Sequence, residues 1–168
     1  YRIYTYLKYA GVRSLDYVFV SHPDKDHISG IYELIEMRDN TFEIKNIVLP
    51  HINNTDETLL EISKMADGAG INVLYACRGD ALSAGNLSIS CVHPCKNYNY
   101  ESANDYSAVY LISFGKFSML MTGDAESKAE KCLIQDARKS DSVVDLQKLS
   151  GINVLKAGHH GSRGASSE

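Results

Sequence analysis

The sequence predicts a fold of the mixed α/β (α+β) class, and two observations support this prediction. Short runs rich in β-branched and aromatic residues alternate with amphipathic segments along the whole chain. No repeat, linker or low-complexity tract interrupts the alternation. The 168 residues are enough for one hydrophobic core, so we expect a single domain over 1–168.

In the first half of the chain, turn and capping residues mark the element ends. Gly11 can end a first helix, and Pro50 closes an apolar run. Thr55 or Asp56 is the expected N-cap of a later helix. The buried side of that helix is predicted to be Leu59, Leu60, Ile62 and Met65. The predicted helices are 4–10, 28–37 and 55–66, and the predicted strands are 17–20, 46–49 and 71–76.

The second half is richer in strands. Gly115-Lys116 separates two apolar runs and predicts a hairpin, and Pro94 closes the run before it. The predicted strands are 86–92, 108–114, 117–121 and 153–156, with a helix over 126–137.

Bulk composition narrows the function classes. A net charge of −4 argues mildly against a basic face for non-specific DNA binding. No apolar run approaches the roughly 20 residues that span a bilayer, and no signal peptide is visible. The sequence starts without Met and stops at GASSE. We therefore expect an incomplete fragment of a longer protein, truncated at both ends.

Four ligand-type residues lie within six positions after the run 17–20, in the segment HPDKDH. In extended backbone His22 and Asp24 point the same way. Asp26 is expected to cap the next helix, and His27 to lie in its first turn. A bend between the two pairs lets each face a different metal ion. The alternative is that the aspartates only cap the helix and the histidines are solvated.

Two further groups also follow predicted strands. Asp124, in Thr-Gly-Asp, ends the strand 117–121 with a carboxylate whose two oxygens can serve one cation each. His159 and His160 follow the last strand, and at most one of them is expected to bind metal because adjacent side chains point apart. The alternative is that both are ordinary loop residues that bind no metal. Since all three groups follow strands, we expect them to gather along one edge of a sheet.

These motifs carry a family resemblance. HPDKDHISG resembles the metallo-β-lactamase-fold signature His-x-His-x-Asp-His, with Asp24 in place of the middle histidine. With TGD, LKAGHHGS and the strand pair NDYSAVYLISFGKFSMLMTGD, this variant is similar to the C-terminal hydrolase domain of the ComEC competence-protein family and its free-standing relatives. The resemblance runs from about Val20 to Ser167.

The resemblance implies a four-layer αββα sandwich with a two-metal site at one edge, missing its first strands and its C-terminal segment. One ion is assigned to His22 and Asp24 and the other to Asp26, His27 and His159, with Asp124 as the bridge. His160 would then donate a proton or contact substrate. A further histidine that many members carry has no clear match, because His93 precedes Asp124 by a long stretch. Asn104 or Ser107 is the alternative in that region.

The chemistry expected from such a site is metal-assisted hydrolysis of a phosphodiester, with zinc or manganese as the two divalent ions. Asp24 or Asp26 would orient the attacking water. The expected substrate contacts are Lys25, Asn104 and Ser162. The alternative for Ser162, and for Ser166 and Ser167, is that they only form a polar turn. The resemblance implies a nuclease that degrades one strand of DNA during competence-type uptake, tethered to a membrane protein.

Two other functions stay open at this stage. The same fold can hydrolyse a small phosphodiester, a choline-phosphate headgroup, a thioester or a lactone, and a free-standing relative of that kind would be soluble and cytoplasmic. The domain can also be a catalytically silent docking module of a membrane DNA channel.

Cysteines and tyrosines leave two minor alternatives. A predicted strand carries Cys91, His93 and Cys95 at alternate positions. One interpretation is a zinc site, and the other, which we favour, is that the thiols are buried in the core. Tyr98, Tyr100 and Tyr106 can stack on bases or, as we favour, pack within a loop.

Overall fold

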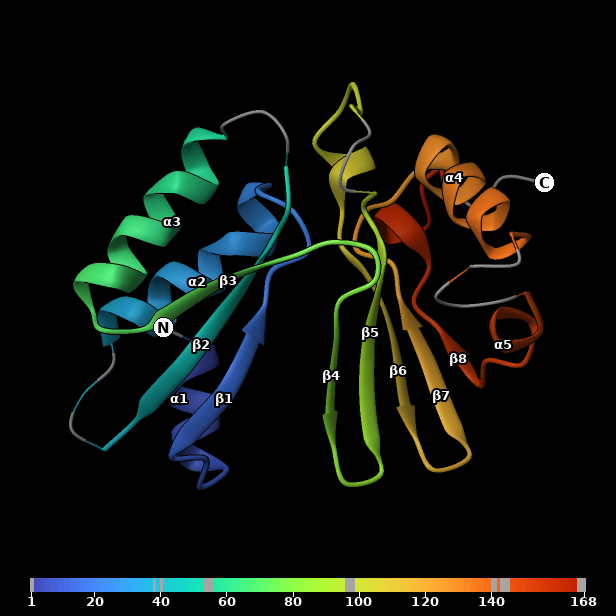
Figure 1. Ribbon diagram of the computed structural model, residues 1–168. Helices are drawn as coiled ribbons and strands as arrows, with labels where there is room; N and C mark the ends of the chain where they lie inside the picture. Colours follow the sequence, from blue (N-terminus) through green and yellow to red (C-terminus); the bar gives the residue numbers. More distant parts are fainter. Residues whose placement is uncertain are drawn as a thin grey trace. The chain divides into compact units, whose positions relative to one another are not determined.

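The computed structural model describes residues 2–37, 39, 41–52, 56–95, 99–139, 142 and 146–165 (Figure 1). The chain divides into two units, and each is described by itself. The first contains the described residues of 1–49 and 54–75, and the second those of 50–53 and 76–168. The expectation of a single domain stays a prediction.

A three-stranded sheet of order β1-β2-β3 forms the first unit (Figure 1). Its strands are β1 (Ser14–Phe19), β2 (Glu43–Pro50) and β3 (Asn72–Ala76), and its helices are α1 (Arg2–Tyr9), α2 (Lys25–Met37) and α3 (Glu57–Gly68). β1 and β2 pair in parallel, with Val18 opposite Ile47. Such a pair needs a crossover connection, and α2 supplies it.

The three helices of this unit pack in a row, with α2 in contact with both α1 and α3. Ile28, Ile31 and Leu34 recur at helical spacing and are buried, so α2 turns one apolar face inward. Gly30 lies against α1, where an added Cβ would collide with the Ile3 side chain. A glycine therefore permits the close approach of α1 to α2.

Two predictions about helix ends and faces need correction. Asp26 does not cap α2, because the helix begins at Lys25 and the carbonyl of Asp24 accepts from the N–H groups of His27 (2.9 Å) and Ile28 (3.1 Å). Asp56 caps α3 as predicted, accepting from the N–H of Leu59 at 2.9 Å, whereas Thr55 lies outside the described residues. Leu60 is exposed, so the buried side of α3 is narrower than predicted.

The second unit contains a five-stranded sheet of order β4-β5-β6-β7-β8 (Figure 1). Its strands are β4 (Ala81–Ala84), β5 (Leu87–His93), β6 (Val109–Phe114), β7 (Phe117–Met121) and β8 (Val154–Leu155). β4 to β7 are antiparallel neighbours, and β8 pairs in parallel with β7. The predicted hairpin is confirmed, with Phe114 opposite Phe117 and Gly115 at φ 58°.

Helix α4 (Ser127–Ala137) contributes to the core of this unit. The buried core consists of Val92, Val109, Leu111, Leu120, Ala125 and Ala129, with Leu133, Leu149 and Ile152 packed against it. Strand β4 and the short helix α5 (Leu146–Ser150) were not predicted. Within the described part of the chain, no helix is both long enough and apolar enough to cross a membrane.

Candidate metal centre

The loop between β1 and α2 holds two imidazole rings through one hydroxyl group. Ser21 Oγ lies 3.1 Å from His22 Nδ1 and 3.2 Å from His27 Nδ1. His22 is fully buried, and the two ring centroids are 4.1 Å apart. If both Nδ1–H groups donate to Ser21, both Nε2 atoms carry a lone pair, which is the form of histidine that binds metal. Sequence reasoning missed Ser21.

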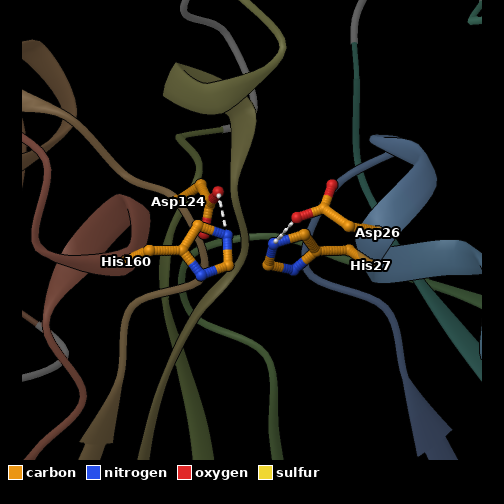
Figure 2. A group of neighbouring side chains, drawn as sticks. All are labelled: Asp26, His27, Asp124 and His160. Atoms are coloured by element: carbon orange, nitrogen blue, oxygen red, sulfur yellow. Dashed lines mark ion pairs between the residues drawn. The ribbon is translucent and has the colours of Figure 1, made fainter.

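Each of these Nε2 atoms faces a carboxylate. His22 Nε2 lies 3.6 Å from Asp24 Oδ2, and His27 Nε2 lies 3.5 Å from Asp26 Oδ2 (Figure 2). Two ligand atoms that are each about 2.1 Å from a tetrahedral zinc ion lie about 3.4 Å apart. Both pairs therefore have the spacing of metal ligands, and His22 and Asp24 lie on the same side as predicted.

The second unit has its own imidazole–carboxylate pair. Asp124 follows β7 and is buried, and its N–H donates to Ser107 Oγ at 3.0 Å. Asp124 Oδ2 lies 3.3 Å from His160 Nε2, again the spacing of two ligands of one ion (Figure 2). Lys156 Nζ donates to the carbonyl of Gly123 at 2.6 Å and lies 3.7 Å from Asp124 Oδ1. A cation beside Asp124 offsets part of its negative charge in the absence of metal.

The turn after β8 holds the two histidines in an uncommon backbone conformation. His159 (φ 40°) and His160 (φ 54°) both lie in the left-handed region. Gly158, before them, lies so close to the strand-end loop that an added Cβ would be 2.5 Å from the carbonyl oxygen of Ala125. This contact places the turn beside the residue that follows Asp124.

The structure gives the two histidines different partners. His160 contacts Asp124, whereas His159 Nδ1 lies 2.7 Å from Glu126 Oε1. Asn104 Nδ2 lies 3.2 Å from the same Glu126 oxygen and 3.4 Å from His159 Nδ1. The geometry therefore favours His160, and not the predicted His159, as the metal ligand beside Asp124. Glu126 was not singled out by sequence.

His93 is a further ligand-type residue at the end of β5. Its side chain is fully buried, and its Nδ1 lies 2.9 Å from the carbonyl oxygen of Ser107. Among the described residues nothing hydrogen-bonds to its Nε2. Burial lowers the pKa of His93 to about 4, so the ring is neutral at pH 7. A neutral imidazole with a buried, unengaged Nε2 is suited to bind a metal ion.

Strand direction explains why His93 and Asp124 lie at the same edge of the sheet. β5 and β7 run in the same direction because β6 between them is antiparallel to both. Their C-terminal ends therefore lie at one edge of the sheet, and β8, parallel to β7, brings His160 to that edge. Ser107 joins two of these residues, since its carbonyl contacts His93 and its hydroxyl accepts from Asp124. Sequence reasoning set His93 aside because chain separation conceals this neighbourhood.

The predicted substrate contacts have different surroundings. Lys25 is exposed at the start of α2. Asn104 is held beside Glu126, as described above. Ser162 lies in a turn, where its N–H donates to the carbonyl of His159 at 2.9 Å and its Oγ accepts from Gly164 at 3.3 Å. Ser166 and Ser167 lie outside the described residues.

Two minor interpretations are also decided. Tyr100 and Tyr106 are buried and pack edge to face with ring centroids 4.9 Å apart, so these two do not stack on bases, and Tyr98 lies outside the described residues. Cys91 is a buried thiol that donates to the carbonyl of His93, and no group of metal-spaced donors among the described residues contains it.

The comparison with known proteins agrees with the motifs. No family model matches the chain. The chain is 26% identical to ComE operon protein 3 of Bacillus subtilis, over 97% of this chain and 19% of that protein. It is 27% identical to Recombination protein 2 of Haemophilus influenzae, over 99% of this chain and 17% of that protein. The resemblance to the ComEC family is confirmed. The chain spans about a fifth of the length of these relatives.

The structural comparison shows the fold. The crystal structure of CmlA, a diiron β-hydroxylase from Streptomyces venezuelae, matches with a TM-score of 0.53 at 15% identity, over 77% of this chain and 24% of that one. CmlA has the metallo-β-lactamase fold, so the predicted fold class is confirmed as a mixed α/β arrangement with two sheets similar to that fold. A likeness at this identity says nothing of activity.

Proposed function

We propose that this chain is the metal-dependent hydrolase domain of a competence-type protein and that it cleaves phosphodiester bonds of single-stranded DNA. The observation that carries the proposal is the contact of one hydroxyl, that of Ser21, with Nδ1 of both His22 and His27. Both Nε2 atoms are thereby set beside carboxylates at the spacing of metal ligands. If both Nδ1–H groups donate to this hydroxyl, both rings have the form that binds metal, and a loop with only a structural role has no need of that arrangement.

The proposed ligand set comes from the resemblance to the ComEC family, whose motifs occur in the sequences of both units. His22, Asp24 and His93 are assigned to one ion, and Asp26, His27 and His160 to the other, with Asp124 as the bridge. In the family that the sequence resembles, the corresponding motifs hold two ions together, and the proposal carries this arrangement over. Two divalent cations held there would supply Lewis acidity, which would lower the pKa of water and stabilise negative charge on phosphate oxygens.

The remaining chemistry belongs to side chains of this chain. Asp24 and Asp26 are exposed and orient the attacking water through their carboxylate oxygens. His159, held by Glu126 at 2.7 Å, is the proposed proton donor to the leaving oxygen. The Glu126 carboxylate orients the His159 ring.

DNA is the proposed substrate because the resemblance to the ComEC family implies it and because one relative is named Recombination protein 2. Exposed Lys25 is positioned at the start of α2, one residue from Asp24, where it can meet a phosphate. A small phosphodiester is the second candidate, favoured by the net charge of −4.

Metal content is the first test. The chain is loaded separately with Mn²⁺ and Zn²⁺, and bound metal per chain is measured by elemental analysis for the wild type and for Asp124→Asn. We expect close to two ions in the wild type and fewer in the variant. Asp67→Asn, at an exposed position of α3, is the matched control and should bind as the wild type does. A folded wild-type chain without metal would contradict the proposal and favour a docking module.

Cleavage is the second test. The loaded chain is incubated with end-labelled single-stranded DNA and, separately, with a chromogenic small phosphodiester. Cleavage of DNA by the wild type and not by Asp124→Asn supports the nuclease. Cleavage of the small diester but not of DNA would contradict the nuclease proposal and favour the second candidate, a small phosphodiester as the substrate.

A further inference from the structure

Two cysteines of the second unit lie close together. Cys95 follows β5, and Cys132 lies on α4, 37 positions later. Their sulfur atoms are 3.8 Å apart. Both side chains are partly exposed, unlike Cys91, and no disulfide joins them in the described structure. Two thiols at this distance need only a small movement to form a bond.

One further turn along α4, Asp136 completes the group. The Cys95 thiol donates to Asp136 Oδ2 at 3.0 Å. Asp136 also forms ion pairs with Arg78 and Lys139. The three donor atoms of Cys95, Cys132 and Asp136 are close enough to hold a metal ion. A cation would have to displace a guanidinium and an ammonium group from Asp136, so the surroundings disfavour metal.

The same surroundings favour a thiolate on Cys132. The contact with Cys95 Sγ at 3.8 Å lowers the pKa of Cys132 to about 6. The Tyr100 hydroxyl and the Lys139 charge also lower this pKa, whereas burial and the Asp136 charge raise it. Cys132 is therefore the sulfur prepared to attack, with Cys95 within reach at 3.8 Å.

We propose that Cys95 and Cys132 form a redox-active dithiol that is oxidised reversibly to an intrachain disulfide by exchange with a low-molecular-weight disulfide carrying carboxylates. Arg78 and Lys139 support the last point, because together they carry two positive charges against the one negative charge of Asp136, and the Lys139 side chain is 56% exposed. All residues of this site lie in the second unit, and the proposal does not depend on the hydrolase proposal.

The exchange proceeds in two balanced steps. The Cys132 thiolate attacks one sulfur of the small disulfide, so a protein–small-molecule disulfide forms and one small thiolate leaves. Cys95 then loses its proton to the released thiolate and attacks the Cys132 sulfur, which releases the second small thiolate, protonated from solvent. The protein loses two electrons as two thiols become one disulfide, and the small disulfide gains them as it becomes two thiols.

The test is thiol trapping in glutathione buffers. The chain is equilibrated at ratios of reduced to oxidised glutathione, remaining thiols are alkylated, and the peptides are identified by mass spectrometry. We expect a Cys95–Cys132 cross-link that disappears as the ratio rises, with Cys77 and Cys91 alkylated throughout after unfolding. If Cys95 and Cys132 are both alkylated at every ratio, the proposal is overturned.

Single variants test the order of attack. Cys95→Ser should accumulate a glutathione adduct on Cys132, because the second step is blocked, whereas Cys132→Ser should acquire at least tenfold less adduct on Cys95. Cys77→Ser is the matched control and should keep the cross-link. Equal adducts on both single variants would contradict the assigned roles. Protection of both thiols by Zn²⁺ alone, without oxidant, would overturn the proposal in favour of a metal site.

Discussion

At the scale of single residues, much of the candidate centre depends on groups that bind nothing themselves. Ser21 contacts both imidazoles of the first cluster, and Ser107 contacts both His93 and Asp124. Such contacts fix which ring nitrogen carries the proton and how each side chain points. A metal ion then meets ligands that are already oriented.

The role of Ser21 leads to a first prediction. Ser21→Ala removes the hydroxyl that holds both rings, so we expect metal affinity to fall by about 10–100-fold while the fold is kept. Competition with a chelating indicator dye measures the affinity. Ser29→Ala, at an exposed position of α2, is the control and should bind as the wild type does. Unchanged affinity in Ser21→Ala would show that the rings are held by other contacts.

The two neighbouring histidines lead to a second prediction. His160→Ala should lower the amount of bound metal, because His160 contacts Asp124, whereas His159→Ala should keep the metal and slow cleavage. Elemental analysis and the cleavage assay give the two readouts for each variant. The reverse result would restore the roles that the motif alone assigns.

The third prediction concerns the thiolate of Cys132. Because its pKa is lowered to about 6, alkylation of the reduced chain at Cys132 should reach half its maximal rate near pH 6, below the value of about 8.5 for an ordinary thiol. Alkylation by iodoacetamide across a pH series, read by mass spectrometry, checks this. Cys91, whose pKa burial raises to about 12, is the internal control and should stay unreactive. A half-maximal rate at pH 8 or above for Cys132 would contradict the assignment.

At the scale of elements, the turn Gly158–Gly161 shows how a short segment places a functional side chain. Both of its histidines have left-handed backbone angles, so the turn depends on its contacts for its shape. One of these is the close approach of Gly158 to the carbonyl of Ala125. Loss of that contact would move His160 away from Asp124.

A fourth prediction follows for this turn. Gly158→Ala places a methyl group against a backbone oxygen, so we expect destabilisation of about 1–3 kcal/mol and weaker metal binding. Urea unfolding followed by circular dichroism measures the stability. Gly151→Ala is the control, because the nearest atom to an added Cβ there is 3.4 Å away. Equal stability of the two variants would contradict this prediction and show that the loop of Ala125 can move to make room for the methyl group.

Elements with strong local signals were predictable. The hairpin at Gly115-Lys116 has two apolar runs and a glycine with positive φ, and the structure confirms it. Strand β4 (ALSA) and helix α5 (LQKLS) were missed because each is only four or five residues long. Segments of that length have no periodicity to detect, and neighbouring elements decide their conformation.

At the scale of the whole molecule, the dithiol connects elements that are distant in sequence. A Cys95–Cys132 disulfide would join the segment after β5 to α4 across 37 positions. Closing a loop of that length reduces the entropy of the unfolded chain. Oxidation is therefore expected to stabilise the second unit.

The fifth prediction gives the size of this effect. The oxidised chain should be more stable than the reduced chain by about 4 kcal/mol. Urea unfolding under oxidising and reducing conditions measures the difference, and Cys132→Ser should show none. An unchanged midpoint, in a chain whose disulfide is proven by mass, would mean that strain in the folded state offsets the loss of entropy.

The sequence by itself determined the family resemblance, the α/β class and the candidate residues of the three motifs. These depend on residue type and short spacing, which are visible along the chain. Only the tertiary structure decided that His160 rather than His159 meets Asp124, that Ser21 joins two imidazoles, and that Cys95 faces Cys132. It also identified His93 as a candidate ligand, because strand direction places the ends of β5 and β7 at the same edge of the sheet. The physical reason is common to all four: such contacts are made between segments by packing and strand pairing, and no local pattern encodes them.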